Sequence, residues 1–216
     1  MSEPRVRLVD QPATSNEHPA IVGTARRRSW VELSVALTAV VVSVASLFVS
    51  RHQAQVMDRQ LAASVWPMME YLTGNTGDSG PQMVLGVSNS GIGPARIRSF
   101  RVLYRGKPAP DAGSLLQSCC GLVHGMPLSI NTSGVAGRLL QQGNSIIFLR
   151  MSQPPDTLPA MRAVFERLGQ ARLELDVRTC YCSVLGDCWT VSSKHDDEDP
   201  APVSSCRDEQ RLPQFR

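Results

Sequence analysis

The sequence predicts a mainly β protein, an antiparallel β-sandwich with one short helix, preceded by a transmembrane helix and a juxtamembrane helix. Three observations lead to this prediction: a long apolar stretch near the N-terminus, at least six short strand patterns separated by loop-forming residues, and one short amphipathic stretch among them. With 216 residues, 5% of them aromatic and 19% charged, the chain suits one small β-rich domain with appendages better than a large enzyme core.

The predicted organisation has five parts along the chain. They are a disordered cytoplasmic tail over residues 1–28, a transmembrane helix over 29–50, a juxtamembrane helix over 51–73, an exported β-sandwich over 74–195 and a disordered tail over 196–216.

The apolar stretch covers residues 30–49, which contain one charge, Glu32, and neither proline nor glycine. Twenty helical residues span the hydrocarbon core of about 30 Å, and Glu32 lies in the first turn, where its carboxylate reaches the interface. Three arginines at 26–28 precede the stretch, so the positive-inside rule places the N-terminus in the cytoplasm. A cleaved signal peptide is the alternative, but nearly thirty residues precede the stretch and no convincing cleavage site follows it.

Residues after the apolar stretch have helical composition, with Val56, Leu61 and Val65 recurring at helical spacing before Pro67. This apolar stripe could pair two copies in a homodimer, but we expect it to dock on its own domain. Ala39 and Ser43 form a small-xxx-small pair that could also dimerise helices, although lipid-facing residues are the simpler interpretation.

Strand patterns begin after a loop at 74–81. Alternation over 83–87 predicts one strand, and a second runs over 95–104, where the inside-outside pattern slips near Ser99 and indicates a β-bulge. The remaining expectations are a helical turn at 114–118, a hairpin of 135–140 with 145–151, a helix over 158–168, a strand over 171–182 and its partner over 188–193.

Six cysteines are the clearest chemical signal. In an exported domain an even number of cysteines indicates disulfides. Cys182 and Cys188 lie on either side of a hairpin turn, so we expect them to pair, and Cys180 then needs another partner, most plausibly Cys119 or Cys120. The sixth cysteine, Cys206, would stay free or take the remaining partner.

A metal site is the alternative use of these residues, since Cys180, Cys182, Cys188 and His195 lie within sixteen residues. Their spacing lacks the Cys-x2-Cys knuckle of structural zinc, and no Cys-x-x-Cys opens a redox helix. None of the sequence patterns of common hydrolases, zinc proteases or phosphate loops occurs, so we expect neither an enzyme nor a cofactor.

The formal charge is +3, and no segment has the dense positive charge that nucleic acid requires, so we exclude that partner. Arg96, Arg98, Arg101 and Arg105 form a basic run that could meet anionic lipid or peptidoglycan, although a solvated strand face explains it as well. Only two of the 22 basic residues are lysine, a bias typical of a GC-rich bacterial genome.

Residues 87–95, VSNSGIGPA, read as a connection between strands, because asparagine and glycine tolerate positive φ and proline fixes the entry to the next strand. With the apolar stretch and the later YCSVLGDCW, this segment resembles uncharacterised membrane-anchored bacterial proteins whose exported domains carry an Asn-x-Gly-x-Gly-Pro-Ala motif. The matching residues are Asn89, Gly91, Gly93, Pro94 and Ala95. The resemblance implies an immunoglobulin-like sandwich and no enzymatic activity.

These observations together predict a single-pass protein of a bacterial inner membrane with a periplasmic domain. We expect the domain to bind a protein partner in the cell envelope, as an accessory or scaffolding component. The alternative is a thiol redox or metal-binding envelope protein that uses the cysteine cluster.

Overall fold

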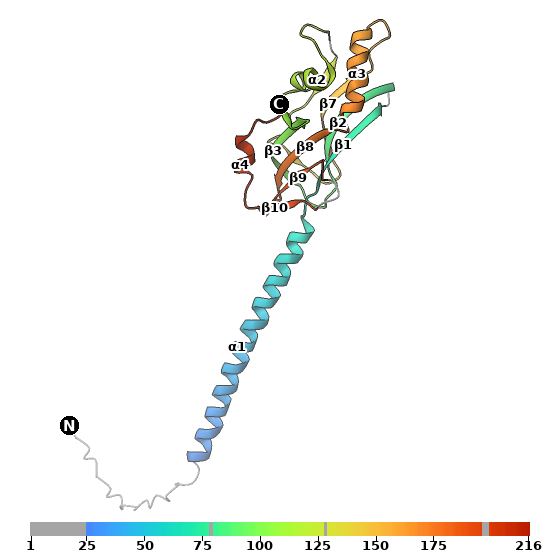
Figure 1. Cartoon of the computed structure of the whole chain (residues 1–216). Coiled ribbons are helices and arrows are strands. Elements are labelled where there is room, and N and C mark those ends of the chain that lie inside the picture. The colour runs from blue at the N-terminus through green and yellow to red at the C-terminus, as the bar shows by residue number, and fades with distance from the viewer. Residues whose placement is uncertain (1–24, 78–79, 128, 196–198) are drawn as a thin grey trace, which may run out of the picture. The chain divides into compact units, whose positions relative to one another are not determined.

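The computed structural model describes residues 25–77, 80–127, 129–195 and 199–216, which form two compact units that divide between Gln55 and Val56 (Figure 1). Most of the predicted cytoplasmic tail, residues 1–24, lies outside the described residues. The second unit is an antiparallel β-sandwich of ten strands with three further helices, which confirms the predicted fold class.

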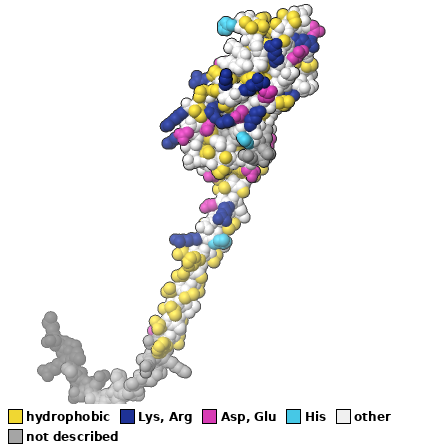
Figure 2. Space-filling view, viewed as in Figure 1, with side chains coloured by type: hydrophobic (Ala, Val, Ile, Leu, Met, Phe, Trp, Pro, Cys, Tyr) yellow, Lys and Arg dark blue, Asp and Glu magenta, His cyan; other side chains and the backbone are white. Residues whose placement is uncertain are grey.

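Helix α1 runs over Ala25–Ser64, and its part Trp30–Ser64 is the one helix of the described chain that is long and apolar enough to cross a membrane. Forty residues correspond to about 60 Å, twice the thickness of a hydrocarbon core. Four hydroxyl side chains in the apolar part donate hydrogen bonds to carbonyls three or four residues earlier, which satisfies them without water. They belong to Ser34, Thr38, Ser43 and Ser46. Figure 2 shows hydrophobic side chains along the apolar stretch of the helix and charged ones between that stretch and the domain.

The juxtamembrane segment differs from the prediction in two ways. It continues α1 without a break but ends at Ser64, because Pro67 has no N–H to offer a further turn, and strand β1 already begins at Met69. Its apolar stripe does not dock on the domain along its whole length: Val56 is 38% exposed and Leu61 is 53% exposed.

The first sheet has the strand order β1-β2-β7-β5. Its strands are β1 Met69–Gly77, β2 Gly80–Asn89, β7 Ser145–Ser152 and β5 Ile130–Thr132. The long β1–β2 pair starts the sheet, and β7 returns to the other edge of β2.

The second sheet has the order β10-β9-β8-β3-β4, with β6 also paired to β3. Its strands are β3 Ala95–Tyr104, β4 Lys107–Ala109, β6 Leu139–Leu140, β8 Leu175–Cys182, β9 Cys188–Ser192 and β10 Ala201–Val203. The register of β3 against β8 shifts between Ile97 and Ser99, as the predicted β-bulge requires. The predicted hairpin of 135–140 with 145–151 is wrong, because β6 pairs with β3 and β7 with β2, in different sheets.

Two helices lie next to each other at one end of the sandwich (Figure 1). Helix α2, Ala112–Cys120, is capped by the side chain of Asp111 and ended by Gly121 in the left-handed conformation. Helix α3, Pro159–Ala171, is longer than predicted, so β8 starts at Leu175 instead of at residue 171, and Leu173 before it is 69% exposed.

The core between the sheets contains three phenylalanines, one from each sheet and one from the C-terminal segment. The ring centroids of Phe100 and Phe148 are 5.0 Å apart, and that of Phe215 lies 6.0 Å from the first and 5.3 Å from the second. Residues 199–216 are therefore part of the fold, so the prediction of a disordered tail is wrong for these residues. Residues 196–198 of the predicted tail lie outside the described residues. They include β10 and the short helix α4, Arg207–Arg211, and Phe215 is 2% exposed.

The C-terminal segment is held because it completes an open edge of β3. Strand β3 pairs with β6 at one end and β4 at the other, which leaves backbone groups unpaired between them. Phe100 N donates to Gln214 Oε1 at 2.8 Å, Phe215 N donates to Phe100 O at 3.0 Å, and Gln210 Nε2 donates to Arg98 O at 3.1 Å. These bonds give partners to backbone groups of β3 that its neighbouring strands leave unpaired.

Candidate functional site

The candidate site is a cluster of two disulfides at one end of the second sheet, together with the loop and the C-terminal segment that they hold. All six cysteines of the chain are paired, as Cys182–Cys188, Cys180–Cys206 and Cys119–Cys120. The first pair is the one that the sequence favours. The expectation that Cys180 pairs with Cys119 or Cys120 is wrong.

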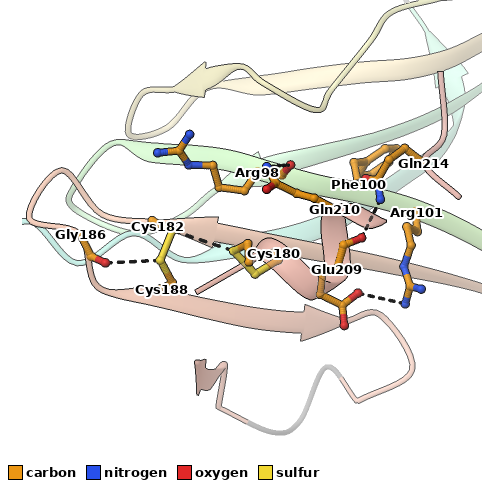
Figure 3. The surroundings of a disulfide bond; sticks show 11 residues. Arg98, Phe100, Arg101, Cys180, Cys182, Gly186, Cys188, Glu209, Gln210 and Gln214 are labelled. Atoms are coloured by element: carbon orange, nitrogen blue, oxygen red, sulfur yellow. Dashed lines mark hydrogen bonds and ion pairs between the residues drawn. A yellow bond between two sulfur atoms is a disulfide. The ribbon is translucent and has the colours of Figure 1, made fainter. Parts of the chain in front are cut away.

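The Cys182–Cys188 disulfide closes the β8–β9 hairpin, where the two residues lie directly opposite each other in the strand register (Figure 3). Within the loop, Ser183 N donates to Asp187 O at 2.8 Å, and Gly186 adopts a φ of 99° that permits the tight turn. The loop is thus fixed by a covalent bond and internal hydrogen bonds. It nevertheless exposes two aliphatic side chains to solvent, Val184 (51%) and Leu185 (49%).

The Cys180–Cys206 disulfide joins the C-terminal segment to β8. Cys180 and Cys182 lie two residues apart and both are buried, so the two disulfides are neighbours, and the Sγ atoms of Cys182 and Cys206 are 3.9 Å apart (Figure 3). The sequence signal for this pair is the even number of cysteines. Once Cys119 is paired with its neighbour Cys120, and Cys182 with Cys188, only Cys180 and Cys206 are left to pair with each other.

The Cys119–Cys120 disulfide lies apart from this cluster, at the end of α2. Its residues are adjacent in the sequence, so it closes the smallest loop of the three and constrains the unfolded chain least. The carbonyl of Cys120 accepts a hydrogen bond from Arg167 Nη1 at 3.0 Å, which links α2 to α3.

The basic run of β3 separates into two groups in the structure. Arg101 is 10% exposed in its side chain and meets Glu209 of α4 at 3.2 Å, while Arg105 meets Glu174 at 3.1 Å. Arg96 and Arg98 instead point to the solvent-exposed face beside the disulfide cluster. A hollow of about 440 Å³ lies there, lined by β3, the hairpin loop and the C-terminal segment.

A second hollow, of about 280 Å³, lies over β8 and β9 and includes Cys180 in its lining. Asp176 accepts hydrogen bonds nearby, from Arg178 Nε at 2.9 Å and from Ser192 Oγ at 2.7 Å. Burial raises the pKa of Asp176, but these hydrogen bonds outweigh it and leave the pKa below its ordinary value. The carboxylate is therefore charged and already bonded within the domain, as expected of a structural group.

The motif at 89–95 forms a structural lock where the chain enters the sandwich. Asn89 is fully buried, and its side chain makes four hydrogen bonds: it accepts from Met68 N (3.1 Å) and Gly91 N (3.2 Å), and donates to Gly93 O (2.8 Å) and Leu140 O (3.1 Å). An asparagine amide has two donors and can accept two bonds in this way, so its capacity is used.

The glycines of the motif are explained by the chain segment beneath them. A Cβ at Gly91 or Gly93 would collide with backbone atoms of residues 65–68. The other two motif positions are Pro94, which directly precedes β3, and Ala95, which begins it and is fully buried. The motif therefore holds the first residues of the domain, and no ligand is needed to explain it.

The histidines of the domain, His124 and His195, both lie on its exposed surface. A scan against protein-family models finds no match for the chain, and a search of curated proteins finds no similar sequence.

Proposed function

We propose that this chain is a single-pass protein of a bacterial inner membrane, with its N-terminus in the cytoplasm and its β-sandwich in the periplasm, and that the domain acts by binding a protein of the cell envelope. The observation that carries the proposal is the pairing of all six cysteines in a domain that follows one apolar helix. Disulfides persist in oxidising compartments such as the periplasm and are rare in the cytosol.

The exposed hairpin loop supports binding as the activity. It presents Val184 and Leu185 on a backbone that is already ordered by a disulfide, so little conformational entropy is lost when a partner covers them. Rigid loops with exposed apolar side chains, set on a β scaffold, are a common form of recognition surface.

A thiol redox or metal-binding protein is the second candidate, because of the geometry of the sulfur atoms. Those of Cys182, Cys188 and Cys206 lie within 4.8 Å of one another, close enough to hold one metal ion if the disulfides were reduced. This candidate requires free thiols in the native protein, whereas the first requires disulfides.

Thiol labelling in intact cells distinguishes the two candidates. Cells that express the full chain are treated with a maleimide polyethylene glycol after quenching and denaturation, with and without prior reduction. We expect no labelled thiol without reduction and six after it. Labelling of three or more cysteines without reduction would refute the exported, disulfide-bonded domain.

Orientation needs a separate measurement. Alkaline phosphatase is active only after export, so a fusion of the enzyme after Arg216 should be active in cells. The control carries alkaline phosphatase on the N-terminal side of the apolar helix, before residue 25, and this fusion should be inactive. The opposite pattern would place the domain in the cytoplasm and refute the proposed location.

We also propose that two copies of the chain pair through the exposed apolar side chains at the C-terminal end of α1. Val56 and Leu61 lie on the part of α1 beyond the apolar stretch, where they face water in a single chain. Cysteine cross-linking of L61C in membranes should give a dimer, whereas the control R59C should give much less. Equal cross-linking at both positions would refute pairing through this face.

A further inference from the structure

The hollow of about 440 Å³ beside the disulfide cluster has three walls from distant parts of the chain. Strand β3 contributes Arg96 and Arg98, the hairpin loop contributes Ser183 and Val184, and the C-terminal segment contributes residues 204–207 and Gln210. Cys182, Cys188 and Cys206 also line it, and the register of the second sheet places Cys182 opposite Arg96.

The lining of this hollow carries positive charge without compensation. Arg96, Arg98 and Arg207 line it, and no aspartate or glutamate does. Among the ion pairs of the described residues none involves these three arginines, although Arg101 in β3 and Arg105 just after it each have a glutamate. The nearby Asp208 lies 3.8 Å from Arg211 instead. The hollow therefore keeps three guanidinium groups available to a ligand.

The two disulfides hold the walls in place before any ligand arrives. Cys182–Cys188 fixes the hairpin loop, and Cys180–Cys206 fixes the residue next to Arg207. Gln210 also bonds to the backbone of Arg98 at 3.1 Å, which ties the C-terminal wall to the β3 wall. A site ordered in this way loses less conformational entropy on binding than a flexible one.

We propose that this hollow binds an acidic peptide segment of a protein partner, with arginine forks on its carboxylates and Val184 beneath a neighbouring apolar side chain. Guanidinium groups bind planar carboxylates through paired, charge-assisted hydrogen bonds. Val184 lines the hollow and is 51% exposed, so it offers an apolar contact beside the charges. The inference rests on the proposed binding function and names the chemistry of its partner.

A peptide fits this hollow better than a phosphate or a lipid headgroup. One phosphate is too small to occupy about 440 Å³ and meet arginines on two separate walls. The headgroup of phosphatidylglycerol carries the same single phosphate, so the same limit of size applies to it. An extended chain with several carboxylates satisfies both conditions.

Fluorescence anisotropy on the full chain in an uncharged detergent tests the proposal. The probe is a fluorescein-labelled decapeptide of alternating glutamate and leucine, and its control replaces each glutamate by glutamine. We expect saturable binding of the acidic peptide, at least tenfold weaker binding of the control, and weakening as salt is added.

A pair of double variants with the same charge change locates the site. R96Q/R98Q should weaken binding at least tenfold, whereas R105Q/R150Q, which alters two exposed arginines outside the hollow, should change it less than twofold. All four positions are exposed, so near-wild-type folding is expected and is checked by urea denaturation.

Equal losses of affinity in the two double variants would overturn the inference, and so would equal binding of the acidic peptide and its glutamine control. It would also be overturned if the acidic peptide did not bind, while inorganic phosphate or phosphatidylglycerol vesicles bound in a way that depends on Arg96 and Arg98. These results are independent of the proposed function, which fails on free thiols or on inverted orientation in cells. Absence of peptide binding by a correctly exported, disulfide-bonded protein would refute the acidic-peptide inference alone.

Discussion

Replacing Asn89 by aspartate should destabilise the sandwich strongly while leaving its shape unchanged. Aspartate has the same size and keeps both acceptor interactions, with Met68 N and Gly91 N. It cannot donate when ionised, so the carbonyls of Gly93 and Leu140 lose their hydrogen bonds and face a negative charge instead.

The magnitude follows from full burial of the side chain. Each buried carbonyl left without a donor costs about 1–3 kcal/mol, so the two together cost about 2–6 kcal/mol, and an uncompensated buried charge adds to this. That is a large part of the roughly 5–15 kcal/mol typical of a domain. Burial raises the pKa of the introduced carboxyl, so the loss is greatest at neutral pH and lessens as pH falls through that pKa.

Urea denaturation of the full chain in an uncharged detergent, followed by tryptophan fluorescence, measures this loss. Trp66 is a useful probe, because its carbonyl accepts hydrogen bonds from Ile92 N and Gly93 N in the same lock. The control is Asn131→Asp, the same change at an exposed position of β5, which should cost less than about 0.5 kcal/mol. A loss below about 1 kcal/mol for Asn89→Asp, or equal losses at both positions, would refute the role given to this side chain.

Three further predictions concern the core, the disulfides and the tyrosines. Phe215→Ala should lower the free energy of unfolding by about 3–5 kcal/mol, because the ring is 2% exposed and packs on two other rings; urea denaturation measures it. Cys206→Ser opens a disulfide with a sequence separation of 26 and should cost about 3.5 kcal/mol by loop entropy, measured in the same way. Burial raises the pKa of both Tyr71 and Tyr181 to about 12, so stability is present below about pH 10 and is lost as pH rises towards 12; tyrosinate absorbance at 295 nm follows these two ionisations.

Matched controls give each of these predictions a contrary outcome. Leu212→Ala, at a 42% exposed position of the same segment, should cost well under 1 kcal/mol, and a loss equal to that of Phe215→Ala would contradict the proposed core position. Opening the Cys119–Cys120 pair should cost less than opening Cys180–Cys206, because it closes a much shorter loop. Tyrosine ionisation complete near pH 10 would contradict the burial of both hydroxyl groups.

The predictions that succeeded depend on local patterns. An uninterrupted apolar stretch predicted α1, alternation predicted β2 and β3, and the slip of that alternation near Ser99 located the β-bulge. The Cys182–Cys188 pair followed from its position across a short turn. In each case the residues that determine the structure lie within a few positions of one another.

The predictions that failed depend on contacts between distant segments. The charged composition of the C-terminal segment suggested disorder, but Cys206 and Phe215 hold it to β8 and to the core. Alternation alone cannot tell which strand is the partner, so β6 was assigned to β7 although it pairs with β3. For the same reason the hollow was not predicted, since Arg96 and Arg207 are brought together only by the folded chain.

The position of Phe215 in the core has a consequence for how this protein is made. The first strand of the sandwich begins at Met69, so about 150 residues must emerge between it and the last ring of the core. Until then Phe100 N of β3 lacks its hydrogen bond to Gln214, and the core lacks one of its three phenylalanine rings. In the topology that we propose, the N-terminus stays in the cytoplasm and the domain crosses the membrane from its first strand towards Phe215, so disulfide formation and core closure finish on the far side.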